Sequence, residues 1–187
     1  MRLKLGAVWR RMGRWQEAGD VFQEALSLAE QAQDDEAMAQ CQQQLGDLWR
    51  DRGHFEQALT WLEQALTTWE QRGREMELSQ TLVEIGVTYW RRGDYAAARQ
   101  TLERSYTLAR AIDNWRTASL ALNTLGNLAY VAGDLVTARA SRKKAWLSAG
   151  RKGMIRALRA FSTIGGHCLG GRGLCPGANL TPGEPAD

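Results

Sequence analysis

Residues 45–65, LGDLWRDRGHFEQALTWLEQA, contain the spacing pattern that decides the fold. Matching residues recur at intervals of forty along the chain. Glycine stands at positions 6, 46, 86, 126 and 166, and again at 13, 53, 93, 133 and 173. Alanine recurs at 18, 58, 98 and 138, and an aromatic residue or leucine at 15, 55, 95 and 135. A fixed period of this length is the signature of a stacked array of repeats.

One period predicts two helices. Between residues 40 and 52 the apolar positions follow i, i+4, i+7 and i+8, which is one face of a helix. Gly53 ends this helix, because glycine accepts the left-handed backbone found at helix C-termini. The apolar pattern then restarts at Phe55 and continues through Ala58, Leu59, Leu62, Ala65, Leu66 and Trp69. We therefore expect an antiparallel helix pair that must stack on neighbours to bury both faces.

The order Leu-Gly-x-x-aromatic, then Gly-x-aromatic-x-x-Ala, resembles the tetratricopeptide repeat (TPR) family. Four copies begin at residues 5, 45, 85 and 125, and together they cover roughly residues 3–150. The period of forty, against about thirty-four in the commonest form, resembles the long-repeat variant of scaffold proteins and bacterial signalling ATPases and regulators. The resemblance implies an all-α solenoid of stacked antiparallel helix pairs, wound as a right-handed superhelix.

The pattern divides the chain into three parts. Residues 1–153 form four helix pairs, of which the first is truncated. Residues 154–173 begin a degenerate first helix of a fifth pair, with Met154, Ile155, Leu158 and Phe161 as its apolar positions. Residues 174–187 form a tail rich in glycine and proline that we expect to be disordered. From these ragged ends we infer a fragment, or an abbreviated relative, of a longer repeat protein.

Composition excludes several classes of protein. The chain has 187 residues, 44% of them hydrophobic, and its three prolines all lie in the tail. No run of about 18 apolar residues could span a membrane. Early arginines at 10 and 11 interrupt any N-terminal secretion signal. The three cysteines do not have the spacing of a disulfide framework, which suits a reducing compartment. We therefore expect a cytoplasmic protein.

No motif predicts catalysis, a cofactor or a metal. The acidic run at 34–36 fits a helix start, where carboxylates favour the positive end of the dipole. The glycine-rich stretch 165–173 lacks the Lys-Ser/Thr of a phosphate loop. His167, Cys168 and Cys175 are one ligand short of a structural zinc site. We therefore expect a protein that is not an enzyme.

The TPR resemblance implies binding on the concave face, which first helices line. Asn127, in Leu-Gly-Asn, resembles the asparagine that long-repeat relatives use on a peptide backbone, and its carboxamide offers both a donor and an acceptor. Trp90 and Tyr130 share one repeat position and could receive apolar side chains. The residues predicted to bind a peptide are Gln43, Asp47, Arg50, Glu84, Trp90, Asn123, Asn127 and Tyr130.

Three functions remain open at this point. The first is a protein- or peptide-binding scaffold. The second is a sensor or regulatory segment of a larger bacterial signalling ATPase or transcription regulator. The third, a nucleic-acid contact, rests on the basic C-terminal part, where residues 135–187 carry nine basic and two acidic residues. Few aromatics are interleaved with these charges, so we do not expect a nucleic-acid partner. No motif identifies the partner or the oligomeric state.

Overall fold

The computed structural model describes residues 2–147, and within this range the chain is entirely helical. The expected fifth first helix (154–173) and tail (174–187) lie outside the described residues. The helices are α1 (Arg2–Arg11), α2 (Trp15–Gln31), α3 (Asp35–Asp51), α4 (Phe55–Gln71), α5 (Glu75–Arg92), α6 (Tyr95–Ala111) and α7 (Trp115–Val131), followed by helical residues 135–147. None of the helices in this part of the chain is long and apolar enough to cross a bilayer.

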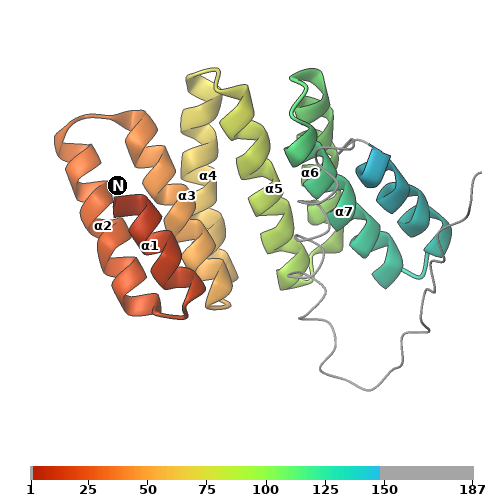
Figure 1. Cartoon of the computed structure of the whole chain (residues 1–187), viewed down its shortest axis with the longest axis horizontal. Helices are drawn as coiled ribbons and strands as arrows, with labels where there is room; N and C mark the ends of the chain where they lie inside the picture. The colour runs from red at the N-terminus through yellow and green to blue at the C-terminus, as the bar shows by residue number, and fades with distance from the viewer. Residues whose placement is uncertain (1, 148–187) are drawn as a thin grey trace, which may run out of the picture.

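The helices form a stack of antiparallel pairs, as the forty-residue period predicts (Figure 1). Within the array, the second helix of one pair packs on the first helix of the next, as α2 does on α3 and α4 on α5. Neighbouring first helices also touch one another, in the order α1, α3, α5 and α7. Among the described residues the second helices α2, α4 and α6 make no such contacts with each other. The stack therefore curves, with the first helices on its inner side.

The turns and helix ends follow the local sequence. Gly53 has φ of +83°, a left-handed conformation that L side chains rarely adopt, and the other three turn glycines of the series share it. Asp94 and Asp134 accept hydrogen bonds from the backbone N–H of Ala97 and Thr137, which confirms them as helix caps. The acidic run at 34–36 is also structural, because Asp34 accepts from the N–H of Ala37.

An arginine lies over an aromatic ring at the turn of each of the first three pairs. The guanidinium carbon of Arg52 is 4.7 Å from the Trp49 ring centroid, and the equivalent Arg92–Tyr89 distance is 4.9 Å. The fourth pair has Ala129 at this aromatic position. Tyr130 beside it does not fill the core in its place, because its side chain points outward and is 64% exposed.

The two helices of a pair approach most closely at a glycine. A Cβ at Gly46 would lie 2.6 Å from Cγ of Leu62, and a Cβ at Gly86 would lie 2.6 Å from Cγ of Leu102. Both leucines are fully buried. In the fourth pair the leucine is replaced by Arg142, and a Cβ at Gly126 would meet nothing closer than 3.4 Å. The helix contact is thus tight in the central pairs and looser in the fourth.

We expect Gly86→Ala to destabilise the protein by about 1–3 kcal/mol, because the new methyl group overpacks against Leu102. Leu102→Ala alone should cost about 2–5 kcal/mol through lost burial and a cavity. The double variant should cost less than the sum of the two, since each change relieves the other. Urea unfolding followed by circular dichroism measures all three differences.

The matched control is Gly126→Ala, where the added methyl group finds only ordinary contacts. This variant should be as stable as the parent, or gain about 0.5–1 kcal/mol from the higher helix propensity of alanine. A cost at Gly126 equal to that at Gly86 would show that the leucine contact is not what determines the spacing of the helices.

Candidate functional site

All eight residues predicted to bind a peptide lie on first helices. They are distributed over α3 (Gln43, Asp47 and Arg50), α5 (Glu84 and Trp90) and α7 (Asn123, Asn127 and Tyr130). Because these three helices contact one another in order, the residues share the inner side of the stack, here called the first-helix face. The structure divides this face into two halves of different chemistry.

The N-terminal half contains a chain of charges across three helices, here called the ion-pair ladder (Arg10, Asp47, Arg50 and Glu84). Arg10 Nη1 of α1 lies 2.7 Å from Asp47 Oδ2 of α3, and Arg50 Nη2 lies 2.8 Å from Asp47 Oδ1. Arg50 Nη1 also donates to Glu84 Oε2 of α5. Each charge therefore meets an opposite charge on its own or an adjacent helix.

Arg50 is the centre of the ladder and only 8% exposed. A charge so far from water is tolerated only when it is paired and hydrogen-bonded. Arg10 holds the same repeat position forty residues earlier, and Trp90 and Tyr130 hold it in the next two pairs. One position thus carries two cations and then two aromatics. The sequence prediction missed Arg10, although its spacing of forty from Arg50 is a signal for it.

The pKa values of the two ladder carboxylates are shifted in opposite directions. Burial by itself would raise the pKa of Asp47, but the guanidinium groups of Arg50 and Arg10 outweigh it and hold this pKa below its ordinary value. The pKa of Glu84 is raised, first by burial and then by the negative charge of Asp47, which together outweigh Arg50. Folding therefore favours an ionised Asp47 and opposes the ionisation of Glu84.

Gln43 is also engaged within the array. Its side-chain N–H donates to the Thr81 hydroxyl of α5, and that hydroxyl in turn donates to the carbonyl oxygen of Glu77. Gln43 therefore joins adjacent helix pairs and retains its Oε1 as an acceptor. The four predicted residues of this half thus serve the contacts between repeats.

The C-terminal half, here called the open half, consists of Trp90, Asn123, Asn127 and Tyr130. Trp90 is half-buried and packs against the cluster that includes Val83 and Leu102. Asn123 is buried, and its Oδ1 has no hydrogen-bond partner among residues 2–147. The side chain of Asn127 is half-buried and makes no hydrogen bond within the described part of the chain. An exposed aromatic ring and an unused carboxamide thus come together on α7.

Comparison with known proteins supports the repeat assignment. Models of the tetratricopeptide repeat match residues 1–71 and 86–104. The chain contains tetratricopeptide repeats. No curated protein sequence matches this TPR chain. The likeness to the solved structures described next concerns the fold, because each is at most 20% identical.

Three solved structures illustrate that likeness. A Rap protein in complex with competence and sporulation factor is 20% identical, with a TM-score of 0.79 over 87% of this chain and 45% of the other. Aspartyl phosphate phosphatase F from Bacillus subtilis is 16% identical, with a TM-score of 0.78 over 91% of this chain and 45% of the other. BtubC from P. vanneervenii is 20% identical, with a TM-score of 0.64, and 96% and 68% of the two chains are covered. The TPR chain thus spans less than half the length of the first two.

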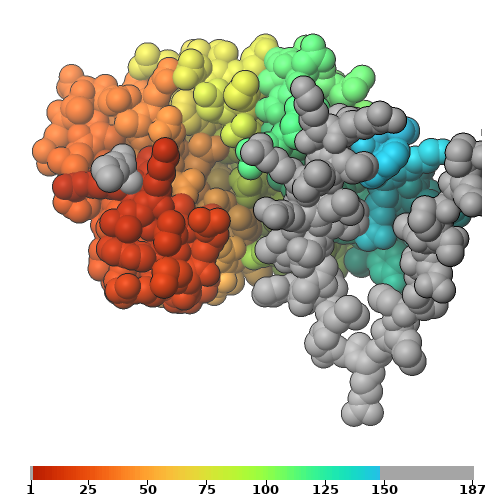
Figure 2. Space-filling model, viewed as in Figure 1, coloured from red at the N-terminus to blue at the C-terminus, as the bar shows by residue number. Residues whose placement is uncertain are grey.

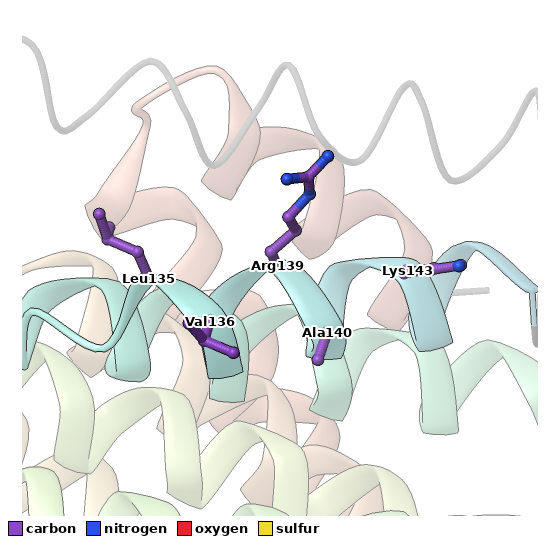
Figure 3. Close-up of a pocket in the computed structure, with 5 residues that line it drawn as sticks. All are labelled: Leu135, Val136, Arg139, Ala140 and Lys143. Atoms are coloured by element: carbon purple, nitrogen blue, oxygen red, sulfur yellow. The ribbon is translucent and has the colours of Figure 1, made fainter.

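A shallow hollow of about 460 Å³ lies elsewhere, on the second helix of the fourth pair (Figure 3). The described residues that line this hollow all lie on one helix. They are Leu135, Val136, Arg139, Ala140 and Lys143. Two cations border an apolar floor. Groups of His, Cys, Asp and Glu that could hold a metal ion are absent from residues 2–147.

Replacing Arg50 with methionine should destabilise the protein by about 2–4 kcal/mol, because the partly buried carboxylates of Asp47 and Glu84 would lose their shared cation. Arg91→Met is the matched control. Arg91 Nη1 lies 3.3 Å from Asp51 Oδ1, but the side chain is exposed, so that pair should contribute about 0–1 kcal/mol. Equal losses in urea unfolding for the two variants would contradict a special role for the ladder.

The ladder also predicts a pH dependence. The lowered pKa of Asp47 contributes stability that is present above its unfolded pKa of about 3.9 and is lost as the pH falls through the folded value. Asp47→Asn should therefore cost more at pH 7 than at pH 3. The raised pKa of Glu84 has the opposite sign, so Glu84→Gln should cost less than Asp47→Asn at pH 7. Urea midpoints at both pH values test this order, and a pH-independent cost at Asp47 would contradict it.

Proposed function

We propose that this TPR chain is a non-enzymatic scaffold that binds a peptide or protein segment along its first-helix face. The observation that carries this proposal is the open half of that face. Tyr130 is 64% exposed there, and the carboxamide of Asn127 has no partner among the described residues. Exposed aromatic rings are enriched among the residues that dominate recognition surfaces.

In this proposal, Asn127 meets the backbone of the bound segment. A carboxamide can donate to a carbonyl and accept from an N–H, which are the two groups that each peptide unit offers. Tyr130 and the half-buried Trp90 would contact an apolar side chain of the ligand. Asn123 is buried beneath this surface. We therefore expect it to hold the neighbouring side chains in position and to contact the ligand only with the small exposed part of its own side chain.

The N-terminal half of the face, which contains the ion-pair ladder, would contribute in another way. Asp47, Arg50 and Glu84 are already ion-paired with one another, so a ligand charge would compete with an internal ion pair there. Gln43 keeps one free acceptor beside them. We therefore propose that these residues set the shape of the face, while the open half supplies most of the affinity.

A second candidate is a sensor or regulatory segment of a larger signalling protein. The observation that favours it is the similarity to the Rap protein, whose solved structure contains competence and sporulation factor. Because the chain covers 45% of that protein, effector functions of such a relative would reside outside the shared part. Binding by the first-helix face would be common to both candidates, and both are compatible with a cytoplasmic location.

A nucleic-acid contact is the third candidate, and it rests on helical residues 135–147. These carry Arg139, Arg142, Lys143 and Lys144 without an acidic residue. Cations in such a cluster attract phosphates. The open half and this basic helix are separate surfaces, so substitutions can distinguish them.

The double variant Asn127→Ala and Tyr130→Ala should weaken binding to an array of immobilised extended peptides by about tenfold or more. Helicity should be unchanged, because neither side chain fills the core. Fluorescence polarisation with the strongest peptide of the array measures the affinity. Circular dichroism reports the helicity.

Lys143→Glu with Lys144→Glu is the matched control, and it should leave peptide affinity unchanged. If instead the charge reversal abolished peptide binding while the Asn127 and Tyr130 variant bound normally, the basic helix would replace the first-helix face as the binding site. Salt-sensitive retention of the parent chain on immobilised DNA, lost in the charge reversal, would favour the third candidate.

A further inference from the structure

The polar contacts between helix pairs stop at the interface between the third and fourth pairs. Five hydrogen bonds or ion pairs join α3 and α4 to α5 and α6, namely Gln43–Thr81, Arg50–Glu84, Asp51–Arg91, Glu56–Arg92 and Glu70–Arg104. No residue of α5 or α6 forms a hydrogen bond or an ion pair with the described residues 115–147. Only the attraction of Arg99 for Asp134 crosses this interface.

The sequence explains why these contacts are missing. Forty residues after each of the five contacts, the two positions no longer carry side chains that pair. In the same order, the replacements are Val83/Ala121, Trp90/Thr124, Arg91/Val131, Ala96/Ala132 and Arg110/Lys144. The last of these places like charges where the preceding interface has an ion pair. The third and fourth pairs are therefore joined mainly by apolar packing, in the cluster of Val83, Ala121 and Leu128.

The fourth pair is also packed less tightly within itself. It lies beside the third pair at one end of the described array, in teal and blue next to the green third pair in Figure 2. A Cβ at Gly126 would meet nothing closer than 3.4 Å, against 2.6 Å at Gly86. Ala129 replaces the aromatic residue of the other three pairs. Because the stability of a repeat is the sum of its own stability and its interfaces, the fourth pair should open first.

The first pair provides an internal comparison, since it lies at the other end of the described array. Arg10 Nη1 of α1 lies 2.7 Å from Asp47 Oδ2 of α3, so a polar contact joins this pair to its neighbour. A Cβ at Gly6 would overlap the ring of Phe22, as in the tight central pairs. A position at the end of the array is therefore common to both pairs, whereas the missing contacts are specific to the fourth.

The open half of the first-helix face spans this interface. Trp90 belongs to α5 of the third pair, whereas Asn127 and Tyr130 belong to α7 of the fourth. A segment that contacts all three residues binds only when the two pairs are packed together. A ligand that binds one of two arrangements shifts the equilibrium toward that arrangement.

We propose that the fourth pair opens from the third as a unit, and that a segment bound to the open half holds it closed. The second part rests on the peptide-binding function proposed above, whereas the first part does not. Opening separates Trp90 from Asn127 and Tyr130 and so removes the site. The fourth pair thereby regulates the binding face, because any change that favours opening also releases the ligand.

Hydrogen exchange of the full chain, measured residue by residue by nuclear magnetic resonance, tests the opening. After correction for intrinsic rates, amides 120–128 of α7 should exchange at least about tenfold faster than amides 81–88 of α5. The central amides of α2 should be protected to the same degree as those of α3. Equal protection of α5 and α7 would overturn the proposal. An α2 as labile as α7 would also overturn it, in favour of fraying at both ends of the array.

Two matched variants test whether the missing polar contacts cause the opening. Ala96→Glu with Ala132→Arg copies the Glu56–Arg92 contact, in which Arg92 Nη1 lies 2.8 Å from Glu56 Oε1. Both alanines are exposed and lie outside the open half. Ala96→Lys with Ala132→Arg places like charges at the same positions. Amides of α7 should exchange about threefold or more slowly in the first variant than in the second. Equal rates would contradict the proposed cause of the opening.

The effect of a ligand is tested with the strongest peptide of the array described above. At about one hundred times its Kd, the peptide should slow exchange of the α7 amides about a hundredfold, because only the closed arrangement binds it. The control is the Asn127→Ala and Tyr130→Ala variant, in which the same peptide concentration should slow α7 about tenfold less.

The outcomes separate this proposal from the proposed function. Fast exchange of α7 in a chain that binds no peptide would overturn the peptide-binding function, and with it the regulatory part, while the opening itself would be confirmed. A peptide that binds the first-helix face with unchanged exchange of α7 would support the function and overturn its regulation by the fourth pair.

Discussion

The close approach of two helices at one glycine is the constraint on which the array depends. At Gly46 and Gly86 the space that a side chain would need is filled by Leu62 and Leu102 of the partner helix. This contact sets the distance between the helices of a pair, and thereby the surface that each pair offers to the next. Because second helices pack on following first helices, while first helices also touch one another, the stack curves toward the first helices.

Curvature brings the residues at corresponding positions of neighbouring first helices together. Where that position carries arginine, as at 10 and 50, the arginine meets carboxylates of adjacent helices and becomes part of a partly buried ion-pair network. Where it carries Trp90 or Tyr130, no such network forms, and the surface stays available. The same geometry therefore yields an ion-paired half and an open half. This division, more than the repeat fold itself, determines where a ligand could gain affinity.

The sequence by itself determined the helix pairs, their turns and their buried positions, because a glycine at a turn and an apolar residue on a stripe act through local backbone and burial preferences. Asp94, Asp134 and Gly53 behave as their local sequence predicts. Only the tertiary structure decided that Arg10 forms an ion pair with Asp47 and that Gln43 donates a hydrogen bond to Thr81. It also decided that the Tyr130 side chain points outward and does not fill the place of an aromatic core residue. Those outcomes depend on distances between helices from different repeats, which a periodic pattern along one chain does not specify.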